Sequence, residues 1–144
     1  MEDEIDYSSL SDDELEQIAQ SDDVLSLAPA LNELHERSPQ RATVIAEKLL
    51  GGNDEWLRAT ALDIVFHEKQ PLALEYMKHH AAACSVPVLR VMVEMLAADS
   101  RTPERSTIEE LLVQVRDRLR DAKGSAVDDS RELFFRKYPD LLSH

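Results

Sequence analysis

Few side chains in this sequence are spaced to bind a metal or to catalyse a reaction. His79, His80 and Cys84 form a His-His-x3-Cys run, which matches no closed zinc pattern. Adjacent histidines also point to different faces of a helix. Carboxylates are abundant, but the chain contains no HExxH, no glycine-rich phosphate loop and no nucleophile elbow. We therefore predict no catalytic residue, no metal and no cofactor.

The remaining reactive side chains have plain structural interpretations. His35 and His67 occupy the ends of expected helices, where an imidazole interacts well with the C-terminal dipole. Cys84 is the single cysteine, and we expect it to be a small packed residue near a turn. With no disulfide, no signal peptide and no apolar run long enough to cross a bilayer, the sequence predicts a cytoplasmic protein.

The net charge of −13 is concentrated near the N-terminus. Residues 1–36 hold 12 acidic residues and no Lys or Arg, whereas the remaining 108 residues hold 17 acidic and 16 basic ones. Such a block repels phosphate and anionic lipid and attracts a basic protein, although it also fits a solubilising terminus. The basic residues lie late in the chain and alternate with acids, so we predict neither nucleic-acid nor membrane binding.

The sequence repeats at an interval of 32 residues. The segment SDDVL (21–25) aligns with NDEWL (53–57) and with SVPVL (85–89). Each segment begins with Ser or Asn, which are good helix N-caps. Prolines 39, 71 and 103 recur at the same interval, and each marks the start of a second helix.

These signals predict an all-α fold, a short α-solenoid of three 32-residue helical hairpins with capping helices at both ends. We expect one domain over 1–144, with an acidic N-terminal cap (1–20), three repeats (21–122) and a C-terminal cap (123–144). The expected hairpin helices are 22–36 and 39–50, 54–67 and 71–83, and 86–98 and 103–122. The capping helices are expected at 12–19, where Ser11 and Glu14 form a capping box, and at 128–137. Pro29 is expected to kink or split the first helix of the first hairpin near Leu27.

The segment DEWLRATAL (54–62) resembles a helix of a HEAT-like repeat, with an acid, an aliphatic-Arg pair, small residues and a leucine. Leu89 and Arg90 repeat the aliphatic-Arg pair, whereas Ser26 replaces the arginine in the first copy. The resemblance covers about 100 residues. It implies an α-solenoid that binds a partner on the face formed by equivalent helices, and it implies no reaction.

Trp56, the only tryptophan, aligns with Val24 and Val88. It fits either an exposed anchor for a partner or an apolar contact between repeats, and the alignment favours the contact. We expect a partner to bind the polar positions of the inner helices and the acidic block, which would form an electronegative groove. The expected partner-binding residues are Asp12, Asp13, Asp22, Asp23, Asp54, Glu55, Trp56, Asp63 and Glu94.

A small, acidic, non-catalytic helical protein fits an immunity protein that neutralises a basic toxin domain by blocking its active surface. This hypothesis rests on size, charge and analogy. The alternative is an adaptor or assembly factor of a protein complex. An enzyme or a nucleic-acid-binding HEAT-like protein is the third hypothesis. We expect the protein to be a monomer when unbound.

Overall fold

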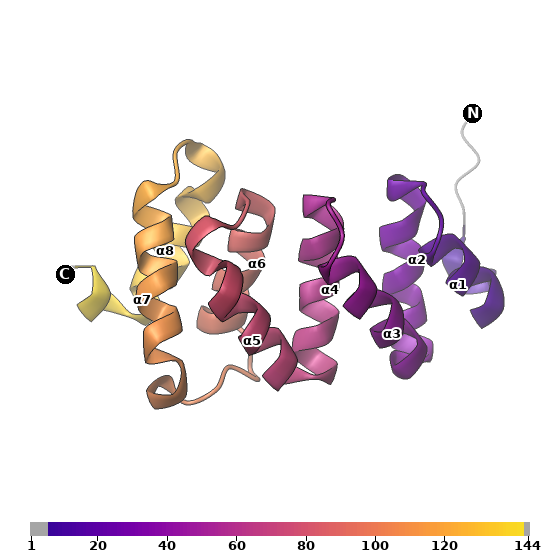
Figure 1. The fold of residues 1–144 in the computed structure, drawn as a ribbon, viewed down its shortest axis with the longest axis horizontal. Helices are drawn as coiled ribbons and strands as arrows, with labels where there is room; N and C mark the ends of the chain where they lie inside the picture. The colour runs from indigo at the N-terminus through magenta and orange to yellow at the C-terminus, as the bar shows by residue number, and fades with distance from the viewer. Residues whose placement is uncertain (1–5, 143–144) are drawn as a thin grey trace. The chain divides into compact units, whose positions relative to one another are not determined.

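The computed structural model describes residues 6–142, and every secondary-structure element in that range is helical (Figure 1). Residues 1–5, with three acids of the predicted N-terminal cap, and residues 143–144 lie outside the described range. The all-α prediction is confirmed. The α-helices within this range are α1 (Asp12–Ala19), α2 (Val24–Arg37), α3 (Pro39–Leu50), α4 (Glu55–Glu68), α5 (Gln70–His80), α6 (Val86–Ala97), α7 (Arg105–Asp121) and α8 (Asp128–Lys137). The 3-10 helices are η1 (Tyr7–Ser9), η2 (Ala81–Ala83), η3 (Ser125–Val127) and η4 (Pro139–Leu141).

The chain divides into two compact units, residues 1–68 and residues 69–144, which we call unit 1 and unit 2. Each unit has its own set of fully buried apolar side chains. The single domain over 1–144 and its three-hairpin solenoid stay predictions. Between residues 6 and 142, none of the helices has the length and apolar character needed to cross a membrane.

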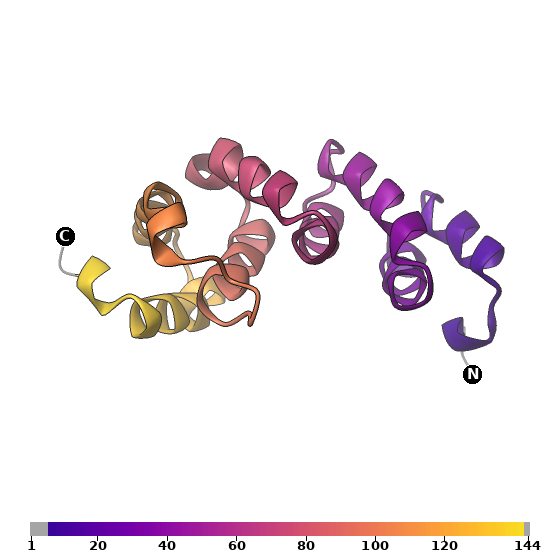
Figure 2. The same ribbon diagram turned by 90° about the horizontal axis from the view of Figure 1, so that it is seen from below.

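Unit 1 consists of η1 and α1 to α4. Helix α2 packs against α1, α3 and α4, and α3 also packs along α4. Figure 2 looks nearly down the axes of α2 and α4 and shows α1 and α3 on one side of that pair. Because α3 returns antiparallel between them, α2 and α4 run in the same direction and start at the same end of the unit (Figure 1).

The core of unit 1 follows helical periodicity. The buried side chains of α2 are spaced i, i+3, i+4 and i+7: Leu27, Ala30, Leu31 and Leu34. In α4 the predicted face is buried throughout: Leu57, Ala61, Ile64 and Val65. Helix α1 adds Leu15 and Ala19, and its capping box is confirmed, since Ser11 and Glu14 exchange backbone-to-side-chain hydrogen bonds of 2.9 and 3.1 Å.

The helix starts repeat at an interval of 31 residues, not 32. Helices α2, α4 and α6 begin at Val24, Glu55 and Val86. The predicted caps Ser21 and Asn53 are replaced by Asp23 and Asp54, whose carboxylates accept first-turn N–H groups. The 32-residue alignment therefore drifts by one residue per repeat at these starts.

The prolines repeat at 32 residues but occupy different places in the helices. Pro39 begins α3, Pro71 is the second residue of α5, and Pro103 precedes α7 by two residues. The predicted start of the last repeat helix at Pro103 is wrong because Thr102 closes a turn there. Its hydroxyl donates to the carbonyl of Asp99 at 2.7 Å and also to that of Met95.

Helix α2 runs unbroken from Val24 to Arg37 through Pro29, so the predicted split near Leu27 is wrong, whereas the predicted kink stays a prediction. Proline removes the hydrogen bond to the carbonyl four residues earlier, here that of Leu25. That residue lies in the exposed first turn of the helix. The interruption therefore falls at the helix start and leaves the later bonds intact.

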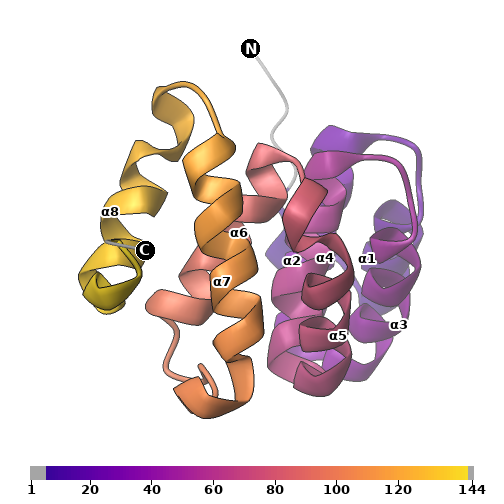
Figure 3. The ribbon, with the colours of Figure 1, turned by 60° about the vertical axis from the view of Figure 1, so that its left-hand side comes forward.

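Unit 2 is built around α6, which packs against α7 and α8 (Figure 3). The predicted stripe of α7 is buried along its whole length: Ile108, Leu111, Leu112, Val115 and Leu119. The Tyr138 hydroxyl donates to the carbonyl of Leu96 and ties the end of α8 to α6. Helix α8 covers the predicted range 128–137, and Pro139 starts η4 after it.

Candidate protein-interaction surface

Two aspartates fix the starts of α2 and α4. Asp23 Oδ1 accepts the backbone N–H of Leu25 at 3.2 Å, and Asp23 Oδ2 accepts the Ser26 hydroxyl at 2.8 Å. Asp54 Oδ1 accepts the N–H of Leu57 at 2.9 Å. Each carboxylate satisfies a donor that the helix leaves unpaired, and its charge suits the positive end of the helix dipole. These caps determine which first-turn side chains face outward.

The second residue of each capped helix faces solvent. Leu25 is 87% exposed and Trp56 is 64% exposed. The interpretation of Trp56 as an apolar contact between repeats is therefore wrong. At the 31-residue interval Trp56 corresponds to Leu25, whereas the aligned Val88 is buried in unit 2. An exposed tryptophan of this kind is a common energetic anchor of protein interfaces.

These residues lie together at one end of unit 1. Helices α2 and α4 pack against each other and start at that end (Figure 1), and packed helices lie about 8–10 Å apart. We call this set the acidic–apolar surface; it comprises Asp22, Asp23, Val24, Leu25, Asp54, Glu55 and Trp56. Five of the nine predicted partner-binding residues are thus brought to one place.

Two acids of this surface have carboxylates that bind no other group of the described chain. Asp22 and Glu55 are exposed, and their carboxylates make no hydrogen bond or ion pair with any residue in the range 6–142. Asp23 and Asp54 differ from them, because their oxygens cap helices. The surface therefore combines two structural carboxylates with two that are available to an external cation.

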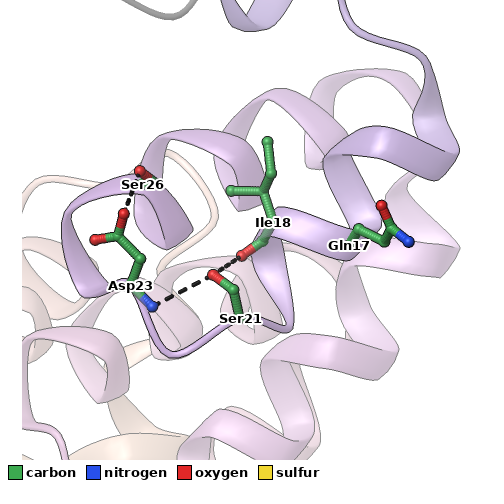
Figure 4. Close-up of a pocket in the computed structure, with 5 residues that line it drawn as sticks. All are labelled: Gln17, Ile18, Ser21, Asp23 and Ser26. Atoms are coloured by element: carbon green, nitrogen blue, oxygen red, sulfur yellow. Dashed lines mark hydrogen bonds between the residues drawn. The ribbon is translucent and has the colours of Figure 1, made fainter.

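A shallow, open hollow borders this surface, between the last turn of α1 and the first turn of α2 (Figure 4). Its volume is about 480 Å³, and its lining residues are Gln17, Ile18, Ser21, Asp23 and Ser26. The Ser21 hydroxyl donates to the carbonyl of Ile18 at 2.7 Å and accepts the N–H of Asp23 at 3.3 Å. These bonds hold the turn that separates the two helices.

Asp12 and Asp13 lie elsewhere in unit 1, at the start of α1. Asp12 accepts the Ser38 hydroxyl at 2.7 Å, and Asp13 Oδ1 lies 2.7 Å from Arg41 Nη2. The hydrogen bonds that Arg41 donates to Asp13 and to Glu16 raise the pKa of its guanidinium, and the bond to Asp13 contributes most. These acids fasten α1 to the corner between α2 and α3. The structure does not place them on the acidic–apolar surface.

The two remaining predicted residues are also separate from the starts of α2 and α4. Asp63 is exposed two turns further along α4 than Trp56, and its carboxylate lies 3.5 Å from His67 Nδ1. Glu94 belongs to unit 2, where it is exposed on α6. Their role in partner binding stays a prediction.

The whole net charge of the chain resides in unit 1. Residues 1–68 contain 17 acidic and 4 basic residues, a net charge of −13, whereas residues 69–144 contain 12 of each. In unit 2 several arginines are bound by the chain itself. Arg118 donates to the carbonyl of Cys84 at 2.7 and 2.9 Å, and Arg105 forms an ion pair with Asp140.

His35 and Cys84 have structural roles within their own units. His35 Nε2 lies 2.8 Å from Glu68 Oε2, which joins the C-terminal ends of α2 and α4. Cys84 is buried, as expected, and this burial raises the pKa of its thiol although the neighbouring Arg118 charge lowers it. Within residues 6–142 no group of three or more His, Cys, Asp or Glu is arranged to hold a metal ion.

Sequence reasoning missed the exposure of Leu25 and the hollow beside it. A signal was present, because Leu25 lies about 200° around a helix from Leu27, two residues at about 100° each. Leu27, Leu31 and Leu34 share one face, so Leu25 had to point away from it. The hollow gave no signal, since it depends on how α1 and α2 pack.

Comparison of the chain with protein-family models, with curated proteins and with solved structures finds no match.

Proposed function

We propose that this protein is a non-catalytic protein-binding module whose acidic–apolar surface binds a basic protein. One observation carries the proposal: exposed Leu25 and Trp56 lie at the same end of unit 1 as the uncommitted carboxylates of Asp22 and Glu55. Apolar side chains exposed beside charges of one sign are typical of an interface with a polar rim.

The two kinds of side chain contribute in different ways. Burying a leucine side chain that was fully exposed contributes about 1.5–3 kcal/mol, and a tryptophan that fills a partner's pocket costs about 2 kcal/mol or more when truncated. The net charge of −13, all of it in unit 1, speeds and orients the approach of a basic protein. Affinity then comes mainly from the anchors, and association rate from the charge.

In its narrower form the proposal is an immunity protein that neutralises a basic toxin domain by covering its active surface. The 144-residue length and the concentrated negative charge support this form by analogy with other small inhibitors. The proposal places the protein in the cytoplasm as a monomer until it meets the toxin. It retains the three-hairpin α-solenoid, which the 31-residue repeat of the helix starts supports.

The test begins with affinity capture from the source cells, followed by calorimetry with the purified partner. Trp56→Ala and Leu25→Ala should each weaken binding, the former by about tenfold or more. Val44→Ala is the matched control, because Val44 is an apolar residue of unit 1 that is 57% exposed on α3, away from this surface. It should change Kd by less than about twofold, as expected of a residue outside the interface.

The outcomes separate the hypotheses. A basic partner whose own catalytic activity is lost at one-to-one stoichiometry supports the immunity protein. A basic partner that stays active while a third protein binds to the complex supports the adaptor instead. Binding that Trp56→Ala and Leu25→Ala leave unchanged refutes the acidic–apolar surface as the interface.

A further inference from the structure

The hollow between α1 and α2 offers hydrogen-bond acceptors almost exclusively. The hydroxyl protons of Ser21 and Ser26 are both used inside the chain, by the Ile18 carbonyl and by the Asp23 carboxylate. The carboxylate itself has no proton to donate. Only the Gln17 amide can turn a donor toward a ligand. The lining therefore suits a ligand that brings its own N–H donors (Figure 4).

The charge around the hollow favours a cation. Its first wall is the last turn of α1, whose exposed carbonyl end carries a partial negative charge, and that turn contains no basic residue. Its second wall is the start of α2, whose partial positive charge is about half a unit and is exceeded by the full charge of Asp23. Asp22 lies beside it, exposed. The net charge around the hollow is therefore negative.

The hollow also has an apolar wall, formed by the half-buried Ile18 side chain. Leu25, the chain neighbour of the lining residue Ser26, is 87% exposed. A side chain with an aliphatic stem and a planar group of five N–H donors matches both the apolar wall and the acceptor oxygens. The stem packs on Ile18 while the donors reach Asp23 and the serine oxygens.

We infer that this hollow binds an arginine side chain of the basic partner, with Asp23 as the residue that recognises the guanidinium. The inference rests on the proposed function, since it names the chemical group that the acidic–apolar surface captures. It adds a specificity site: Asp23 caps α2 and at the same time presents its remaining lone pairs to the partner's arginine.

The experiment uses the full-length ¹⁵N-labelled chain and a free probe, so it needs no identified partner. N-acetyl-L-arginine amide is titrated into the protein while amide chemical shifts are followed by NMR. We expect saturable changes in the amide chemical shifts of Ile18, Ser21 and Ser26, with a Kd in the millimolar range. N-acetyl-L-citrulline amide, the neutral isostere, should bind about tenfold or more weakly, because charge-assisted hydrogen bonds are lost.

Asp23→Asn is the test variant and Asp22→Asn is its matched control. Asparagine caps a helix as well as aspartate does, so Asp23→Asn removes the charge while keeping the fold. Asp22→Asn removes the same charge from a neighbouring exposed residue outside the hollow. We expect Asp23→Asn to weaken the arginine probe about tenfold and Asp22→Asn to weaken it less than about twofold.

Several results would overturn the inference: equal shifts with citrulline, shifts spread over all exposed acids, or equal effects of the two variants. The result is independent of the partner experiment. If the arginine probe fails while Trp56→Ala abolishes partner binding, the proposed function stands and the arginine site falls. If the probe binds but Trp56→Ala and Leu25→Ala leave the partner bound, the hollow is an arginine site and the acidic–apolar surface is not the interface with the partner.

Discussion

Replacing Leu25 by alanine tests whether α2 is oriented as the structure has it. Leu25 is 87% exposed, so the substitution removes almost no buried area, and we expect the free energy of unfolding to change by less than about 0.5 kcal/mol. Leu31 lies in the same helix and is fully buried. Leu31→Ala should cost about 2–5 kcal/mol, through lost burial and the cavity that remains.

The assay is urea-induced unfolding followed by circular dichroism, with the slope m compared among the variants. Leu57→Ala provides a second reference, since Leu57 is buried in α4 and aligns with Leu25 at the 32-residue interval. We expect Leu57→Ala to behave like Leu31→Ala and unlike Leu25→Ala. A loss of stability in Leu25→Ala equal to that in Leu57→Ala would refute the 31-residue register and with it the acidic–apolar surface.

Three further outcomes are expected. Asp54→Ala should lower the free energy of unfolding by about 0.5–2 kcal/mol and Asp54→Asn by much less, because asparagine retains the cap to the Leu57 N–H; urea titration measures both. Cys84 should react with iodoacetamide at pH 8 much more slowly in the folded than in the urea-unfolded chain, because burial raises the pKa of its thiol, and equal rates would contradict the packing. Burial likewise raises the pKa of the Tyr138 hydroxyl above its usual 10.0. The stability that neutral Tyr138 contributes is therefore fully present below pH 10 and is lost as the pH rises above it. The urea midpoint of the wild type should fall beyond pH 10 more steeply than that of Tyr138→Phe.

The elements with strong local signals were predictable from the sequence. Helices α1, α3 and α8 begin and end where a capping box, a proline at the first position and a flanking proline indicated. The buried stripe of α7 also follows directly from the spacing of its apolar residues. Each of these signals lies within the element it specifies, so packing with other helices did not alter the result.

The register of the repeats was harder to predict because several residues compete for one role. Ser21, Asp22 and Asp23 are all good N-cap types, and the sequence alone does not choose among them. The structure uses Asp23, which turns Leu27 and Leu31 into the core and Leu25 outward. Choosing the cap therefore requires knowing how α2 packs against α1, α3 and α4, which is tertiary information.

Among the acids predicted to bind a partner, some are used by the fold of unit 1 and others are not. Asp12, Asp13 and Asp23 form hydrogen bonds or ion pairs within unit 1. Reversing their charges would place lysines against arginines or uncap a helix, so any loss of binding would include a loss of fold. Asp22 and Glu55 carry no such role among the described residues.

The informative charge reversal is therefore Asp22→Lys with Glu55→Lys. Both carboxylates are exposed, and Glu55 lies in the first turn of α4, so reversal should lower the free energy of unfolding by only about 0.3–1 kcal/mol. Association with a basic partner should slow at low salt and approach the wild-type rate at high salt, where screening removes the steering. Stopped-flow kinetics at two ionic strengths measures this directly. An association rate that neither the reversal nor salt alters would mean that the charge of unit 1 serves solubility alone.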